Sequence, residues 1–451
     1  MRLISILLFA LSGLVLVTHA SAVALNPGKE GQVLIFPYYS NLGGNQTLIQ
    51  ITKPLQGAGA SAPRALKVHF RDRNGNRVLS FNLYLAEALW SAAITTVNGQ
   101  SQLILPDNSC TVPQLKQAGT NNAVAVPLTS GFFEVVDMGS IIEQTTIDAA
   151  KDFDCDRLEA MWAEGGVWQT GDSGFELAPP QGRLRGTAQL INVQEGTLYS
   201  FVATALTEFS DIPQHTGPES EVPNLSTPHD AGTASGNTQS VRCFKPVQEP
   251  AACIVDTWAD PKDAVAAVLS SNELRGEYTI NDEVGAKAEL ILTFPLEPFR
   301  TEGDGLPSAP VMLDISGVIG PNAGWCAPLL SVPPCIGNYQ QFTSESVSLV
   351  SFNDKSEDFG NLVVPDILKD AHIAFFPEPG DPPLPKASTV GVYFPGVLPQ
   401  LLTSNSGTRY AGVPVIGYIL QKYTNGQLSN EQGETIKANY GNAFELSQKG
   451  N

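Results

Sequence analysis

The chain has 451 residues, with 45 acidic and 26 basic side chains and a net charge of −19. This acidity argues against nucleic acids and anionic membranes as partners, because both are bound through basic patches. Charged residues make up only 16% of the chain, whereas glycine and proline number 41 and 33, a composition typical of a turn-rich β protein.

Residues 1–22 predict a signal peptide. Arg2 gives the positive start, residues 3–17 form an apolar run, and residues 20–22 are a small-residue cleavage site, with a second such site ending at Ala24. The run is shorter than the about 20 residues of a membrane span, and no later stretch is apolar enough to cross a bilayer. Without Arg2 the net charge is −19 − 1 = −20. We expect an exported protein of the periplasm, the cell surface or the medium, with no membrane span after the signal is removed.

Residues 23–180 predict an N-terminal β-sandwich with a helical insertion. In the alternating run at residues 65–71, Leu66, Val68 and Phe70 are expected to face a core. Lys67, His69 and Arg71 are expected to face solvent. Asn74-Gly75 and Asn98-Gly99 suit the positive φ angles of two-residue hairpin turns. Further strands are predicted at residues 31–40, 46–52, 77–85, 91–97, 101–106 and 131–138.

The helical insertion is predicted as one helix within residues 145–166. Cys155, Leu158, Met161 and Trp162 recur there at helical spacing, and Gly165-Gly166 ends the run.

Residues 181–451 predict a C-terminal β-rich region that begins with strands at 186–193 and 197–206. A long loop of Pro, Ser, Thr, Gly and acidic residues follows at 210–240, and a loop of this length is either functional or poorly ordered. A short helix is predicted at 260–271, with proline near its first turn. The later strands alternate with proline-rich connectors. The predicted fold class is mainly β, as tandem antiparallel, immunoglobulin-like β-sandwiches with short helical insertions.

All six cysteines lie after the signal, which fits disulfides in an oxidising compartment. Six cysteines allow fifteen connectivities, and proximity favours three pairs. Zinc would need paired cysteines or histidines at short spacing, which the chain lacks. The expected pairs are Cys110–Cys155, Cys243–Cys253 and Cys326–Cys335.

Residues 171–174 read Gly-Asp-Ser-Gly, the motif that presents the nucleophile in trypsin-like proteases. Such a serine needs a histidine base and an orienting acid. The only histidine upstream of Ser173 in the mature chain is His69, on the expected solvent face, and Phe175 replaces the second glycine of the motif. We therefore interpret the motif as a turn. No catalytic residue and no cofactor is predicted.

Three patterns suggest metal sites, and none is adopted. Asp152, Asp154 and Asp156 open like an EF-hand loop, but Arg157 stands where glycine is needed and Ala163 where the bidentate Glu is needed. An acidic helix start explains them better. Asp72, Asn74 and Asn76 are explained by a hairpin turn. His215 and the pair His229-Asp230 lie in the long loop, where imidazoles with a nearby acid could hold a metal, but exposed histidines are the ordinary outcome there.

Tryptophans supply an alternative function. Trp90, Trp168 and Trp258 cannot be placed from sequence, whereas Trp162 and Trp325 are expected in the core. Exposed tryptophans on a β-sandwich would favour a glycan-binding protein, or a glycoside hydrolase if two carboxylates lay about 5–10 Å apart.

Three stretches, NPGKEGQVLIFPYYSNLGGNQTLIQIT at 26–52, LILTFPLEPF at 290–299 and GVPVIGYILQKYTNG at 412–426, together resemble a functionally uncharacterised family of exported proteins of Gram-negative bacteria. The resemblance spans most of the mature chain. It implies one contiguous exported β-rich protein and brings no catalytic residues.

The leading hypothesis is a secreted or cell-surface structural or adhesive protein without catalytic activity. Its expected partners are cell-surface components or the chain itself. One alternative is a filament subunit in which residues 31–39 pair with a neighbour by strand addition. We expect this segment instead to be a central strand of its own sheet.

Overall fold

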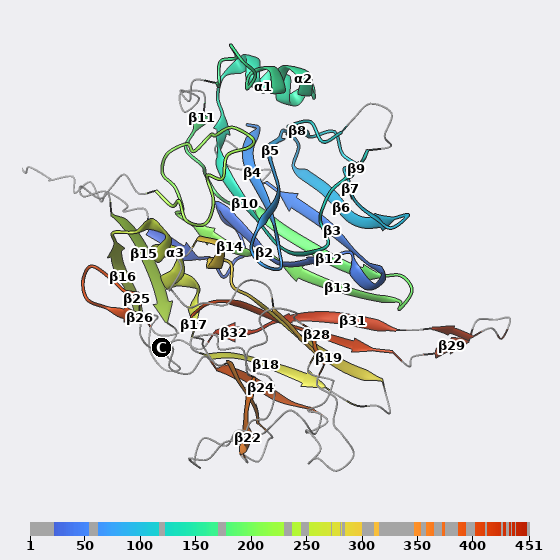
Figure 1. The fold of residues 1–451 in the computed structure, drawn as a ribbon. Coiled ribbons are helices and arrows are strands. Elements are labelled where there is room, and N and C mark those ends of the chain that lie inside the picture. Colours follow the sequence, from blue (N-terminus) through green and yellow to red (C-terminus); the bar gives the residue numbers. More distant parts are fainter. Residues whose placement is uncertain are drawn as a thin grey trace, which may run out of the picture.

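The computed structural model shows a mainly β protein with several antiparallel sheets and three short α-helices among the residues it describes (Figure 1). None of these helices is long and apolar enough to cross a membrane. The described residues are 22–53, 62–116, 122–169, 177–229, 237–244, 252–271, 273–279, 281, 285–299, 311–314, 347–352, 358–364, 372–374, 387–393, 402–410, 413–424, 427–429, 433, 435–437 and 439–448.

The first sheet has ten strands, nine of them in the order β16-β15-β1-β14-β2-β10-β4-β5-β8, while β11 pairs with β10. Neighbouring strands are antiparallel except β1 and β15. Since β2 has β14 on one side and β10 on the other, the prediction of a central strand is confirmed. The strands are β1 (Ala22–Leu25), β2 (Val33–Ser40), β4 (Arg64–Asp72), β5 (Arg77–Leu85), β8 (Cys110–Val112), β10 (Ser130–Ile141), β11 (Leu177–Ala178), β14 (Thr204–Thr207), β15 (Thr238–Phe244) and β16 (Ala252–Trp258).

The second sheet has six strands in the order β13-β12-β3-β6-β7-β9. It shares a core with the first sheet, in which Phe36, Ile51, Phe70 and Trp90 are at most 1% exposed. Close packing here leaves no room beside Phe36, because a Cβ on Gly186 would lie 2.2 Å from its ring. The strands are β3 (Asn45–Thr52), β6 (Leu89–Val97), β7 (Gln100–Ile104), β9 (Ala123–Ala125), β12 (Arg185–Asn192) and β13 (Thr197–Val202).

Two five-stranded sheets form the C-terminal part. The third sheet is β22-β21-β24-β18-β32 and the fourth is β23-β20-β19-β28-β31. Their strands are β18 (Glu273–Thr279), β19 (Ala286–Thr293), β20 (Val311–Asp314), β21 (Val347–Phe352), β22 (Asp358–Val364), β23 (His372–Ala374), β24 (Ala387–Tyr393), β28 (Ile416–Tyr423), β31 (Tyr440–Glu445) and β32 (Ser447–Gln448). Three two-stranded pairs complete the described strands: β17 (Ser270–Ser271) with β27 (Val413–Pro414), β25 (Leu402–Thr403) with β26 (Arg409–Tyr410), and β29 (Gln427–Ser429) with β30 (Thr435–Lys437).

A second core joins the fourth sheet to the first two. Phe201 and Tyr418 meet edge to face at 5.3 Å, and the Tyr418 hydroxyl donates to the Val202 carbonyl. Helix α3 (Pro261–Leu269) packs into the same core, and a 3-10 turn, η4 (Glu297–Phe299), follows β19. Because β12 to β16 complete the first two sheets, the predicted boundary at residue 180 does not coincide with a division between sheets.

The single helix predicted within residues 145–166 is wrong: two helices, α1 (Gln144–Lys151) and α2 (Cys155–Ala160), stand there. Phe153 between them has φ 56°, a left-handed conformation that interrupts a helix. The Asp154 carboxylate then caps α2 by accepting from the Arg157 amide. Asp154 and Asp156 therefore lie at the start of α2, as expected, whereas Asp152 lies at the C-terminal end of α1.

The two predicted hairpin turns differ. Asn98-Gly99 forms the expected two-residue turn, with φ 51° and 78°, between the paired residues Val97 and Gln100. At Asn74-Gly75 the prediction is wrong, because β4 ends at Asp72 and β5 begins at Arg77, so the loop is longer. The Asp72 carboxylate accepts from the amides of Asn74 and Asn76 and stabilises this longer loop. A 3-10 turn, η1 (Leu42–Gly44), leads into β3.

Two of the predicted disulfides are confirmed. Cys110 on β8 bonds to Cys155 at the start of α2, and Cys243 bonds to Cys253 across β15 and β16. The first disulfide ties the helical end to the first sheet. The third predicted pair, Cys326–Cys335, lies outside the described residues. Two disulfides indicate an oxidising, extracytoplasmic environment.

Candidate functional site

A row of buried charged and polar side chains runs along β4, with one neighbour on β10, on the face of the first sheet opposite the core that it shares with the second. Lys67 and His69 are fully buried and Arg71 is 3% exposed, so the prediction of a solvent face on β4 is wrong. His69 pairs in register with Glu134 of β10, which is also fully buried. We call Lys67, His69, Arg71 and Glu134 the polar row.

The reason for this burial is the segment 210–229, which lies across the row and which we call the strap. Lys67 Nζ donates to the Gly217 carbonyl at 2.5 Å, and His69 Nε2 lies 3.1 Å from the Pro223 carbonyl oxygen. Glu134 accepts from the Leu225 amide. Further donors to strap carbonyls, on the neighbouring strand β5, are Arg77, Ser80 and Asn82.

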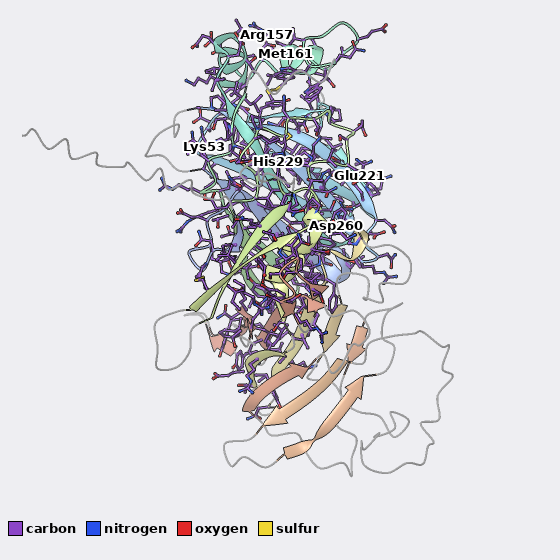
Figure 2. All side chains as sticks on the ribbon, turned by 90° about the vertical axis from the view of Figure 1, so that its left-hand side faces the viewer. Lys53, Arg157, Met161, Glu221, His229 and Asp260 are labelled. Atoms are coloured by element: carbon purple, nitrogen blue, oxygen red, sulfur yellow. A yellow bond between two sulfur atoms is a disulfide. The ribbon has the colours of Figure 1, made fainter. Side chains whose placement is uncertain are left out.

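These contacts show that side chains of the first sheet hold the strap in place. Its backbone forms no long strand against the sheet, so its carbonyls need other donors, and the row supplies them from side chains. Figure 2 shows Glu221 and His229 of the strap on the side of the molecule, well below Arg157 and Met161 at the helical end. Within the long loop predicted at 210–240, residues 210–229 therefore form a well-defined cover over the polar row.

Charge in the row is largely neutralised. Arg71 and Glu134 form an ion pair, with Nε and Nη2 each 3.0 Å from Oε1. Burial lowers the pKa of Lys67 to about 7. Burial, aided by the positive charges of Arg71 and Lys67, lowers the pKa of His69 to about 3. The row therefore holds a neutral imidazole that the strap shields from any substrate.

His215 of the strap sits in an aromatic cage rather than in solvent, so the expectation of an exposed loop histidine is wrong here. Its ring lies 4.7 Å from that of Trp168 and 4.8 Å from that of Trp162. Its Nε2 is 3.0 Å from the Tyr84 hydroxyl, which also accepts from Trp162 Nε1. Burial lowers the pKa of His215 to about 3, so the cage holds the neutral ring.

These two buried rings make stability depend on pH. Unfolded histidines titrate near 6.5, so the unfolded chain takes up protons that the folded rings refuse. Their contribution is complete above pH 6.5 and is lost as the pH falls towards about 3. Each ring adds about 1.4 kcal/mol per pH unit to that slope. We expect His215→Phe to remove one such increment, measured by urea unfolding between pH 6.5 and 5.

Equal slopes for wild type and His215→Phe would contradict the assignment of a neutral ring to the cage.

His229, the second histidine predicted in the long loop, lies beside Asp211. His229 Nδ1 lies 2.9 Å from Asp211 Oδ1, and both side chains are partly exposed. Asp230, which was expected beside His229, lies outside the described residues. Among the residues that the structure describes, no three His, Cys, Asp or Glu side chains converge as a metal site.

A second polar cluster surrounds Asp256 on β16. Its carboxylate accepts from the hydroxyls of Ser404, Ser406, Thr408 and Tyr410. Burial opposes ionisation, but these four hydrogen bonds together lower the pKa of Asp256. The donors all belong to the β25–β26 hairpin, so the cluster fastens this hairpin to the edge of the first sheet.

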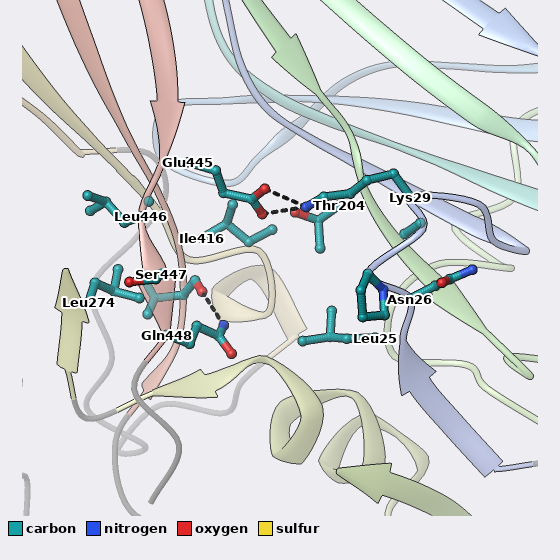
Figure 3. A pocket seen from close by; sticks show the side chains of 14 residues that line it. Leu25, Asn26, Lys29, Thr204, Leu274, Ile416, Glu445, Leu446, Ser447 and Gln448 are labelled. Atoms are coloured by element: carbon teal, nitrogen blue, oxygen red, sulfur yellow. Dashed lines mark hydrogen bonds and ion pairs between the residues drawn. The ribbon is translucent and has the colours of Figure 1, made fainter. Parts of the chain in front are cut away.

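A cavity of about 390 Å³ lies between the N-terminal sheets and the third and fourth sheets (Figure 3). This volume is within the range of small-ligand sites. Leu25, Ile416 and Leu446 make much of its wall apolar, and Lys29 and Glu445 at its side form an ion pair at 2.5 Å. These two charges satisfy each other, whereas the hydroxyl of Thr204, which also lines the cavity, has no hydrogen-bond partner among the described residues.

The outer face of the second sheet, away from its core, is exposed, and within its six strands the one charged side chain is that of Arg185 at the start of β12. In the register across all six strands, Ser200, Gln189, Leu48, Ala93, Ile104 and Ala123 form one continuous row. We call this surface the neutral face. Its members are exposed or half-buried: Gln46, Leu48, Gln50, Thr52, Leu89, Ser91, Ala93, Gln102, Ile104, Ala123, Ala125, Thr187, Gln189, Ile191, Leu198, Ser200 and Val202.

Charged side chains stand only at the margin of these strands and are held there. Arg185, at the start of β12, pairs with Glu30 at 2.9 Å. Asp107, after β7, accepts from the backbone amides of Ser91 and Ser109. An uncharged sheet face is unusual on a chain whose net charge is −19, since strands that face solvent ordinarily carry charges that prevent association.

The remaining sequence candidates are not brought into one site. Ser173 and its motif lie outside the described residues, as does Trp325. Trp90, Trp168 and Trp258 are at most 2% exposed, so none of them can stack on a sugar. Sequence reasoning missed the polar row and the neutral face. The alternation of residues in β3, β6, β12 and β13 is the sequence signal that could have indicated the neutral face.

Comparison of the chain with family models, with curated proteins and with solved structures finds no match.

Proposed function

We propose that the protein is an exported structural or adhesive protein of the extracytoplasmic space, and that it acts by contact through the neutral face. The observation that carries the proposal is the uncharged outer face of the second sheet. Residues with short hydroxyl, amide and aliphatic side chains can bury their area without desolvating a charge. Large exposed areas of this kind mark interaction sites.

Three further features agree with this function. The two disulfides suit an oxidising compartment, and the predicted signal peptide and the resemblance to exported bacterial proteins point the same way. The strap is tied by hydrogen bonds to the polar row of the first sheet, and the first sheet shares a close-packed core with the second sheet, which carries the neutral face. Rigid elements make better contact surfaces than loops, because little ordering entropy is lost on binding.

The proposal is tested by fractionating the producing cells and labelling their surface with an antibody. We expect the wild-type protein to be retained at the cell surface or in assemblies visible by electron microscopy. Gln189→Glu places one charge in the centre of the neutral face and should release the protein into the soluble fraction. If the charge lowers the binding free energy of this contact by about 1.4 kcal/mol, the contact is tenfold weaker.

Gln181→Glu is the matched control, because Gln181 is an exposed residue outside the second sheet. It should be retained like the wild type. Free monomer as the only wild-type species, in the medium and in the periplasm, would overturn the proposed function.

A further inference from the structure

We propose that the cavity between the N-terminal sheets and the third and fourth sheets binds an uncharged small molecule with an aliphatic body and one hydroxyl or carbonyl oxygen. This site goes beyond the proposed function, because none of its lining residues belongs to the neutral face. In Figure 3, Thr204 and Lys29 of the N-terminal part stand on one side of the cavity, and Leu446 and Gln448 stand on the other. A bound molecule therefore contacts both parts of the fold.

Much of the cavity wall is apolar and closely packed. Four of its side chains are at most 4% exposed, namely Leu274, Val415, Ile416 and Leu446. The packing at this wall is tight, because a Cβ on Gly417 would lie 2.6 Å from Leu446 Cδ1 and 2.8 Å from Leu274 Cδ1. An aliphatic body that fills the cavity is removed from water together with these side chains, which favours binding.

The volume of the cavity limits the size of the molecule. A cavity of about 150 Å³ takes a six-carbon ring such as benzene. By that measure the volume of about 390 Å³ has room for roughly fifteen non-hydrogen atoms. Pro27 and Ser447 belong to the lining and are exposed, so the cavity is open to solvent and a molecule of this size can enter.

One buried hydroxyl in the lining lacks a partner. Ala205 of β14 packs into the core of the first two sheets and Leu206 into the second core. Because side chains alternate along a strand, Thr204 points to the same side as Leu206, where the cavity lies. Thr204 is 5% exposed, and its Oγ1 has no hydrogen-bond partner among the described residues. A hydroxyl both donates and accepts, so a ligand hydroxyl or carbonyl can satisfy it.

The charged groups of the cavity favour an uncharged molecule. Both carboxylate oxygens of Glu445 accept from Lys29 Nζ, at 2.6 and 2.5 Å. The amide nitrogens of Asn26 and Gln448 are also engaged, because they donate to backbone carbonyls. An anionic ligand would have to break the pair of Lys29 and Glu445 or enter without a counterion, and either costs free energy.

Isothermal titration calorimetry of the mature chain tests the inference, with 1-octanol as the uncharged probe and octanoate as the probe that is charged at neutral pH. We expect one 1-octanol site per chain and binding of octanoate that is weaker by about tenfold or more. Thr204→Val keeps the shape of the side chain and should weaken 1-octanol binding about fivefold, through the loss of one hydrogen bond. The melting temperature of the ligand-free variant should be unchanged or higher, because the hydroxyl has no partner to lose.

Filling the cavity supplies a second test. Leu25 is half-buried at the end of β1 and lines the cavity, so the larger side chain of Leu25→Trp should occupy the space and abolish 1-octanol binding. Leu42→Trp is the matched control, because Leu42 is 50% exposed and lies outside the lining; it should bind like the wild type. If Leu25→Trp fails to fold, Thr204→Val decides alone. A wild type that does not bind 1-octanol up to the solubility of the alcohol overturns the inference, as does wild-type affinity in either cavity variant.

Discussion

Arg71→Met is expected to lower the free energy of unfolding by about 3–5 kcal/mol at pH 7, because it leaves the buried carboxylate of Glu134 without its cation. Arg71 and Glu134 are 3% and 0% exposed, so water cannot replace the lost ion pair. Burial raises the pKa of Glu134, against the opposing effect of Arg71, and the variant should therefore take up a proton on folding. Urea unfolding at pH 7 and at pH 5 measures both effects.

A double variant separates the pair from its burial. Arg71→Met with Glu134→Gln removes both charges, while the glutamine oxygen can still accept from the Leu225 amide that Glu134 binds. It should recover more than half of the lost stability. The matched control is Arg185→Met, which breaks an exposed pair with Glu30 and should cost less than about 1 kcal/mol. Equal losses for Arg71→Met and Arg185→Met would refute the burial argument.

Removing the Cys110–Cys155 disulfide is expected to cost roughly 4 kcal/mol, and removing Cys243–Cys253 roughly 3 kcal/mol, from the chain-entropy model. The difference arises because the first bond closes a loop of 45 residues and the second closes a loop of 10. Double alanine variants are suitable because Cys110 is buried and a serine hydroxyl there would need a partner. Chemical unfolding without reductant measures each loss.

Reductant provides the control for the disulfide variants. Wild type in excess dithiothreitol should unfold near the midpoint of the variant that lacks both bonds, and each variant that lacks one bond should lose only the stability of the bond it retains. A smaller loss for Cys110→Ala/Cys155→Ala than for Cys243→Ala/Cys253→Ala would show that loop length does not dominate.

The neutral face and the polar row illustrate two ways in which this chain uses one sheet face. On the second sheet, the outward residues are short and uncharged, and they remain accessible to a partner. On the first sheet, Lys67, His69 and Arg71 occupy equivalent alternating positions, but the chain covers them with its own strap. The neutral face therefore stays open as a contact surface, whereas the polar row contributes hydrogen bonds within the folded chain.

The strap also explains why His69 and His215 are not accessible to a ligand. His69 contacts the Pro223 carbonyl and His215 fills the aromatic cage. Their pKa values, about 3 in both cases, keep them neutral at physiological pH. Both neutral rings contribute to the stability of the fold, and a strongly acidic medium would lower that stability.

Local patterns in the sequence determined the strands, the Asn98-Gly99 turn and two disulfide pairs, because alternation, turn chemistry and short cysteine spacing are encoded within a few neighbouring residues. The mainly β class follows from the same patterns. The helix boundary at Phe153 was missed because a non-glycine residue in the left-handed conformation does not alter the hydrophobic periodicity of the sequence.

Only the tertiary structure decided which polar faces stay exposed. The sequence shows the same alternation in β4, where Lys67 is fully buried, and in β12, where Gln189 is half-buried at the surface. The difference comes from residues 210–229, which are distant in sequence and lie across one sheet only. Whether a strand face is buried depends on the segment that packs against it, and the residues of the strand itself do not show which segment that is.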